Sequence, residues 1–281
     1  MILGTVLNTT VKDIWDLPIL LALMPHAMYI TGGFLYFRGG QYRAREAMRT
    51  LTLNPKMAAV LYLRPFRSDA TALRQTFLAL FTFGDFNLLT HTECLADVLK
   101  PFGQMLMVGR PGEGLPRPGA ASLYADNAEW QALVTEQMSD ARLVVIRPGQ
   151  SDGIMWELGS ARRHVRPDRL LIELPGFSKR RYRELREQFA TRGIHLPVKV
   201  KRRGGFIRFN QGWEPEYLPM TYPILRSGMF NIRRKWIHFT LRPVFESQGI
   251  PWDLPKIPIG TIFVFILLPL GLVLYYTIVP S

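Results

Sequence analysis

Two long apolar stretches lie at opposite ends of the chain. Residues 17–37 and residues 257–279 contain no formally charged side chain, and the second stretch includes the run Thr261–Leu268. A helix needs about 20 consecutive apolar residues to cross the ~30 Å hydrocarbon core of a bilayer. We therefore expect transmembrane helices at 17–37 and 257–279, the first preceded by an N-terminal tail at 1–16.

An alternative for the first apolar stretch is a secretory signal peptide. Such a peptide follows a basic segment and ends at small residues. Here Asp13 and Asp16 precede the stretch, and Arg38 closes it. Pro18 and Pro25 are compatible with a membrane helix, in which neighbouring helices and water satisfy the freed backbone groups. These features favour a membrane span.

Basic residues predict the orientation of the two spans, because cytoplasmic flanks are enriched in lysine and arginine. Four arginines follow the first span and Lys256 directly precedes the second, whereas the tails carry Lys12 alone. The four arginines are Arg38, Arg43, Arg45 and Arg49. We therefore expect an integral protein of the bacterial inner membrane, with two spans and a cytosolic central part.

The central part begins with a connector at 38–53 and continues with a predicted domain at 54–213. Apolar runs without polar alternation, typical of strands covered on both faces, occur at 58–63, 105–108, 143–146 and 170–174. Helical patterns separate these runs at 92–101, 127–138, 154–164 and 178–192. This alternation predicts an α/β, flavodoxin-like domain with a parallel sheet between layers of helices.

A basic and aromatic return segment follows at 214–256. Between residues 224 and 245 it combines arginine and lysine side chains with Phe230, Trp236, Phe239 and Phe245. This composition is typical of an amphipathic helix at a membrane interface. We expect the segment to lie along the inner leaflet.

The charge balance of the chain predicts an anionic partner. The 281 residues include 35 Lys and Arg against 22 Asp and Glu, a formal net charge of +13. Anionic lipid headgroups attract such a domain. Nucleic acid is the competing explanation, but no zinc-finger or RNA-recognition pattern accompanies the basic clusters at 199–203 and 233–235, so we do not expect it.

Metal and disulfide chemistry are not expected. The chain has one cysteine, Cys94, which excludes an intramolecular disulfide. Its five histidines never occur at metal-ligand spacing. The sequence therefore predicts a site without metal and without a resident cofactor.

In open parallel sheets, ligands bind beyond the carboxyl ends of the strands, so we consider the loops after Leu63, Val108 and Ile146. The first loop carries Arg64, Arg67 and Asp69, a set that suits phosphate groups but equally fits surface salt bridges. The second loop, at 109–114, is rich in glycine and carries Arg110, but it lacks the spacing of a dinucleotide fingerprint or a Walker loop.

The third loop, at 150–161, gives the strongest signal. Ser151 or Asp152 can cap the following helix, and Gly153 allows a ligand to approach the backbone. Glu157 lies one turn inside, where the helix dipole favours its ionised form. An ionised carboxylate suits the oxocarbenium character that develops when an N-glycosidic bond is cleaved. A structural glutamate near Arg162 or Arg163 is the alternative.

Three short segments resemble a Toll/interleukin-1 receptor (TIR) domain over about half the chain. They are the opening 61–64 (LYLR), the stretch 140–146 (DARLVVI) and the turn 156–158 (WEL). The resemblance implies that Glu157 supports cleavage of NAD, with Trp156 beside it. The segment 152–161 is also similar to the signature of nucleoside 2-deoxyribosyltransferases, whose glutamate attacks the sugar.

Two main hypotheses follow. The first is a membrane-anchored nucleotide N-glycosidase that consumes NAD or a related nucleotide, with Arg64, Arg67 and Arg110 at the phosphates and Glu157 at the ribose. The second is a non-catalytic module that senses a nucleotide or assembles with copies of itself. A scaffold dependent on anionic lipid is a third. Glycines in both spans allow close helix packing, so assembly into a homo-oligomer is an open alternative.

Overall fold

A computed structural model of the chain describes residues 39, 58–65, 90–109, 121–124, 130–149, 151–220 and 232–253. The two expected spans, the N-terminal tail and nearly all of the connector lie outside these residues. Among the residues that are described, no helix has both the length and the apolar character needed to cross a bilayer.

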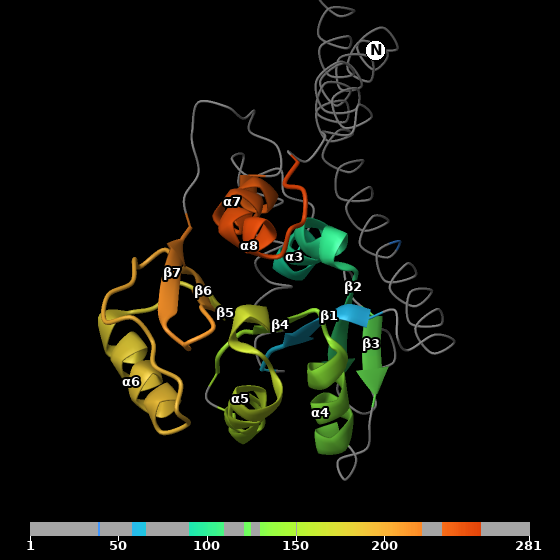
Figure 1. The fold of residues 1–281 in the computed structure, drawn as a ribbon. Coiled ribbons are helices and arrows are strands. Elements are labelled where there is room, and N and C mark those ends of the chain that lie inside the picture. The colour runs from blue at the N-terminus through green and yellow to red at the C-terminus, as the bar shows by residue number, and fades with distance from the viewer. Residues whose placement is uncertain are drawn as a thin grey trace, which may run out of the picture.

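A seven-stranded sheet forms the centre of the domain, with strand order β3-β2-β1-β4-β5-β6-β7. The first five strands in sequence are parallel, and β6 and β7 add an antiparallel edge (Figure 1). The strands are β1 Ala58–Leu63, β2 Gln104–Gly109, β3 Ala121–Tyr124, β4 Leu143–Ile146, β5 Leu170–Leu174, β6 Gly205–Phe209 and β7 Pro215–Pro219. The predicted α/β class with a mostly parallel sheet is confirmed, and the order is consistent with a flavodoxin-like fold.

Helices cover both faces of this sheet. Figure 1 shows α3, α7 and α8 over one face and α4 and α5 over the other. The helices are α3 His91–Leu99, α4 Trp130–Asp140, α5 Asp152–His164, α6 Lys179–Ala190, α7 Ile232–Thr240 and α8 Arg242–Ser247, with 3-10 turns at Lys100–Phe102 and Pro167–Arg169. Each central strand therefore needs apolar side chains on both sides.

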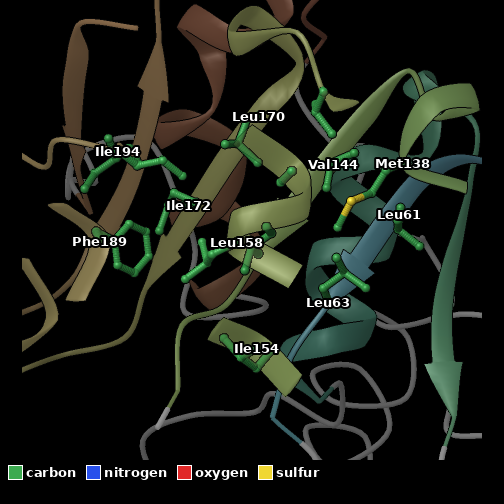
Figure 2. Close-up of a cluster of buried hydrophobic side chains, with 14 of the residues drawn as sticks. Leu61, Leu63, Met138, Val144, Ile154, Leu158, Leu170, Ile172, Phe189 and Ile194 are labelled. Atoms are coloured by element: carbon green, nitrogen blue, oxygen red, sulfur yellow. The ribbon is translucent and has the colours of Figure 1, made fainter. Parts of the chain in front are cut away.

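The central strands satisfy this requirement by alternation between two cores. Leu61 and Val144 point into a core that α4, α5 and α6 complete (Figure 2). Tyr62 and Val145 point into a second core that α3, α7 and α8 complete. All four residues of β4 are buried, which explains why its sequence shows no polar alternation.

The chain changes direction within the sheet between β1 and β4. It leaves β1 toward β2 and β3 on one side and returns on the other side with β4 and β5. The backbone N–H of Arg147 donates to the carbonyl of Leu63 at 2.8 Å, so the carboxyl ends of the two strands lie together. Such a switch point is where open α/β sheets bind their ligands.

The return segment does not have the predicted placement. Strand β7 pairs with β6, and α7 and α8 pack on the sheet, where Ile237, Leu241, Val244 and Phe245 are buried. An ion pair between Arg234 and Asp97 joins α7 to α3. Of the aromatic residues that we assigned to the inner leaflet, Phe245 is therefore inside the domain, whereas Trp236 is 37% exposed. The compact unit extends to residue 253, beyond the expected boundary at 213.

Replacing Phe245 with alanine tests this placement. The ring is 1% exposed and lies edge-to-face with Phe102 at 4.9 Å. Its loss should lower the free energy of unfolding by about 3 kcal/mol or more, because a cavity remains in the core. Chemical denaturation in mild detergent, followed by tryptophan fluorescence, measures the change. Phe102→Leu should show a smaller loss, whereas an unchanged Phe245→Ala midpoint would contradict the packing described.

Candidate functional site

Two Arg-Pro dipeptides follow the strands at the switch point. Arg64 and Pro65 come directly after β1, and Arg147 and Pro148 come directly after β4. Proline lacks the N–H group that would continue a strand ladder, so both strands end here. A Cβ atom added at Gly149 would lie 2.3 Å from Cγ of Pro65, so glycine is required where the two loops meet.

The described residues include six of the predicted site residues. These are Arg64, Ser151, Asp152, Gly153, Trp156 and Glu157. Arg64 is half-buried at the end of β1, and the other five open helix α5 after β4. The remaining predicted residues, Arg67, Asp69 and Arg110, lie outside the described residues.

Ser151 begins helix α5. Its backbone is extended, at φ −80° and ψ 145°, and its hydroxyl oxygen accepts from the N–H of Ile154 at 3.5 Å. Ser151 is therefore the N-cap, and Asp152 is the acidic residue of the first turn. The cap fixes where the helix starts, and hence which side chains it turns toward its neighbours.

One side of α5 faces α4 through a pair of tryptophans. The rings of Trp130 and Trp156 lie edge-to-face, with centroids 4.8 Å apart. Further along, the hydroxyls of Thr135 and Ser160 are 3.5 Å apart. Glu157 is three residues before Ser160, so these two side chains are neighbours on the helix surface.

Glu157 is buried, and burial dominates its electrostatics. The residue is 8% exposed, and its Oε2 atom accepts no hydrogen bond from the described part of the chain. Burial raises the pKa of Glu157 from 4.5 to about 8. A helix dipole contributes at most about 2 kcal/mol in favour of a carboxylate, less than this desolvation costs. The carboxyl is therefore protonated at neutral pH, which corrects the ionised state expected from the sequence.

An open groove runs along a different side of α5. It measures about 590 Å³. Its lining comes from α5 and from the end of α6: Asp152, Met155, Trp156, Gly159, Arg163, Thr191 and Arg192. Arg192 joins the two elements, because its Nε atom donates to the carbonyl of Met155 at 2.8 Å. Trp156 borders both the groove and the contact with α4, whereas Glu157 does not line the groove.

A second carboxylate, Glu173 on β5, lies at the same end of the sheet and was not predicted. Its side chain is 3% exposed. The hydroxyl of Tyr62 donates to Oε2 at 2.7 Å, and Nη1 of Arg147 donates to Oε1 at 3.1 Å. Nε2 of His91, the first residue of α3, lies 2.7 Å from the same Oε1 atom. Four elements therefore meet at one carboxylate.

The partners of Glu173 reverse the effect of its burial. Burial by itself raises the pKa of this group, but the nearby His91 and Arg147 and the hydrogen bond from Tyr62 lower it to about 2. Burial of the phenol and the neighbouring Glu173 carboxylate raise the pKa of Tyr62. A charged residue inside the apolar strand 170–174 is the signal in the sequence that could have pointed to this cluster.

No protein-family model, no curated protein and no solved structure gives a significant match to the chain. The class that the structure defines is therefore an α/β protein with a mostly parallel sheet, in which Glu157 and Glu173 are buried toward the switch-point end. The TIR resemblance stays a prediction.

Replacing Glu173 with glutamine should lower the free energy of unfolding by about 3 to 5 kcal/mol at pH 7, because Arg147 loses its buried counter-charge. The pKa of Glu173 is lowered, so its contribution is present above pH 4.5 and is lost as the pH falls toward 2. Denaturation at several pH values should show that loss in wild type only. The control Glu216→Gln removes an exposed partner of Arg208 and should cost less than about 1 kcal/mol.

Replacing Glu157 with glutamine should have the opposite effect on the pH dependence of the free energy of unfolding. Because the pKa of Glu157 is raised, the folded state holds a proton between pH 4.5 and about 8 that the unfolded state lacks. Wild-type stability should therefore fall by up to about 1.4 kcal/mol per pH unit across that window. Glu157→Gln should lose this part of the slope, whereas Glu136→Gln, exposed on α4, should keep it. Parallel pH profiles for Glu157→Gln and wild type would show that Glu157 is ionised.

Proposed function

We propose that the chain is a membrane-anchored N-glycosidase with a TIR-like cytosolic domain, and that NAD is its substrate. The observation that carries the proposal is Glu157, a buried carboxyl one turn inside the helix that follows β4 at the switch point, whose Oε2 atom has no hydrogen-bond partner among the described residues. A buried, uncompensated carboxyl costs free energy, which is typical of a functional group.

A cationic substrate explains how this carboxyl becomes active. The nicotinamide ring of NAD carries a positive charge, and an opposite charge nearby favours the ionised form of a carboxyl. Binding would therefore lower the pKa of Glu157 from about 8 and release its proton. A carboxylate created in this way has little water around it, so it acts strongly on positive charge.

The bond between C1′ of the ribose and the ring nitrogen then breaks. Its electron pair goes to the nitrogen, so nicotinamide leaves as a neutral molecule without a proton donor. The positive charge passes to the ribose as an oxocarbenium ion, which the Glu157 carboxylate stabilises. Water adds to C1′ and loses a proton to solvent, which gives ADP-ribose.

Other described residues have supporting roles in this proposal. The rings of Trp130 and Trp156, at the contact between α4 and α5, would offer an aromatic surface for the nicotinamide. Arg64, half-buried at the end of β1, would contact the phosphates together with Arg67 and Arg110. Ser151, Asp152 and Gly153 form the rim of the site at the start of α5.

A second candidate is a module without chemistry, which senses a nucleotide or assembles with copies of itself. The observation in its favour is that the open groove is lined by the outer side of α5, while Glu157 is 8% exposed. A ligand in that groove would contact Trp156 and Arg163 and would not reach the carboxyl. The membrane helices would then transmit binding without turnover.

The first test is release of nicotinamide from NAD by the detergent-solubilised full chain, measured by chromatography. Glu157→Gln should lower kcat/KM by at least about 100-fold, whereas Glu136→Gln should leave it unchanged. For wild type, kcat/KM should rise with pH and level off above about 8, because the carboxylate is the active form of the free enzyme.

Two results would overturn this proposal in different ways. If neither wild type nor Glu157→Gln releases nicotinamide, the result would favour the sensing or assembly module. Activity on neutral nucleosides that falls as the pH rises through about 8 would mean that Glu157 acts as a proton donor to the base. That outcome would move the chain toward the chemistry of nucleoside hydrolases.

A further inference from the structure

A strongly basic surface lies beside the antiparallel edge of the sheet. Residues 178–203 contain ten lysines and arginines against two glutamates, which accounts for most of the formal net charge of +13. They belong to helix α6 and to the segment that leads into β6, and Figure 1 shows α6 next to β6 and β7. Eight of the ten cations are exposed, and we call them the basic face: Lys179, Arg180, Arg181, Arg183, Lys199, Lys201, Arg202 and Arg203.

Two contacts join the two parts of the basic face. The hydroxyl of Tyr182 on α6 donates to the carbonyl of Pro197 at 2.7 Å. Just before α6, a Cβ atom added at Gly176 would lie 2.8 Å from the carbonyl oxygen of Arg202. The segment 197–203 therefore runs against the first turns of α6, so the cations of both parts belong to one continuous surface.

The charge of the basic face is not balanced within the described part of the chain. Of its eight cations, Arg180 is the one that forms an ion pair with another described residue, Glu184, and its side chain is 91% exposed. Arg181 lies over the ring of Phe177 at 5.4 Å, a contact that does not neutralise its charge. Like charges on one surface repel each other and lower stability, so the basic face favours an anionic partner.

An exposed aliphatic side chain lies within the basic face. Val198 directly precedes Lys199 and is 71% exposed, and Trp236 is the other exposed large apolar residue in the described part of the chain. Proteins that bind single-stranded nucleic acid stack bases on exposed aromatic rings, but Tyr182 is buried and Phe177 is half-buried. A basic surface with an exposed aliphatic side chain instead fits the boundary between lipid headgroups and acyl chains.

We infer that the basic face docks on a bilayer surface rich in anionic lipid, with Val198 entering the headgroup region. The inference rests on the membrane-anchored part of the proposed function and does not depend on the chemistry at Glu157. It gives the basic face the contact that the sequence assigned to the return segment. In that segment α7 and α8 pack on the sheet, and Arg234 is paired with Asp97.

The test places an environment-sensitive dye on the thiol of Val198→Cys in the full chain, reconstituted in lipid nanodiscs. The native Cys94 is buried, so the introduced thiol reacts first. The dye emission should shift to shorter wavelength in phosphatidylcholine discs that contain about one third phosphatidylglycerol, but not in phosphatidylcholine alone. About 1 M salt should remove the shift, because it screens the charges. The control is the same dye on Glu136→Cys, exposed on α4, which should emit alike in both discs.

Removal of charge shows whether the basic face itself is responsible. Each cation near an anionic surface favours binding about fivefold, so loss of four should weaken docking by about 100-fold or more and abolish the shift. The four replaced by glutamine are Lys199, Lys201, Arg202 and Arg203. A matched variant, which should keep the shift, replaces four exposed cations elsewhere: Lys100, Arg142, Arg163 and Arg166. Thermal unfolding checks that both variants fold, as expected for exposed side chains.

Equal emission in both discs, an equal shift at Glu136→Cys, or a shift that survives loss of the four cations of the basic face would overturn the inference. So would a single-stranded RNA that binds the chain through these cations while the lipid shift is absent. Incorporation into the discs, measured by size-exclusion chromatography, tests the membrane anchor separately. A chain that does not incorporate would refute the anchor, and salt-sensitive co-sedimentation with vesicles of the same charged composition would then decide the docking.

Discussion

Glu173 is the interaction on which the end of the sheet depends. A carboxylate inside an apolar strand costs several kcal/mol unless other groups compensate it. Its partners come from β1, from the loop after β4 and from α3, so satisfying one buried charge holds three other elements in place. The arrangement of the switch point therefore follows from the need to compensate this buried charge.

The contact between Arg147 and Glu173 also affects the other face of the sheet. The contact of Arg147 with Glu173 holds the start of the loop after β4, and Gly149 fits closely against Pro65. Ser151 then caps α5 only a few residues later, so little freedom remains in where the helix begins. The start of the helix determines which residues face α4, and therefore places Glu157 in its buried position.

The two glutamates show how environment sets the chemistry of identical groups. Both are buried, at 2% and 8% exposure. Glu173 has an arginine, a histidine and a phenol as partners, and its pKa falls to about 2, whereas burial raises the pKa of Glu157 to about 8. At neutral pH the Glu173 carboxyl is charged, whereas the Glu157 carboxyl is protonated. Pairs of this kind are typical of sites that run acid and base chemistry near neutral pH.

The sequence predicted the features that depend on local pattern. The run 143–146 predicted a central strand, and the residues around Ser151 predicted a cap, because burial on both faces and helix starts leave local signatures. The return segment was misplaced because basic and aromatic residues at helical spacing fit a lipid interface and a protein core equally well. Tyr62 and Glu173 are 111 residues apart, so only the folded chain brings them together. The protonation of Glu157 depends on how deeply its side chain is buried, and the position of the residue in the helix does not reveal this.

The protonation state of Glu157 bears on substrate choice in the proposed reaction. A nucleotide with a neutral base would not supply the positive charge that lowers the pKa of Glu157, so the carboxyl would stay protonated. A ligand with a cationic base would ionise Glu157 in the binding event itself. Selectivity for a nicotinamide nucleotide would then follow from electrostatics without a base-specific hydrogen bond.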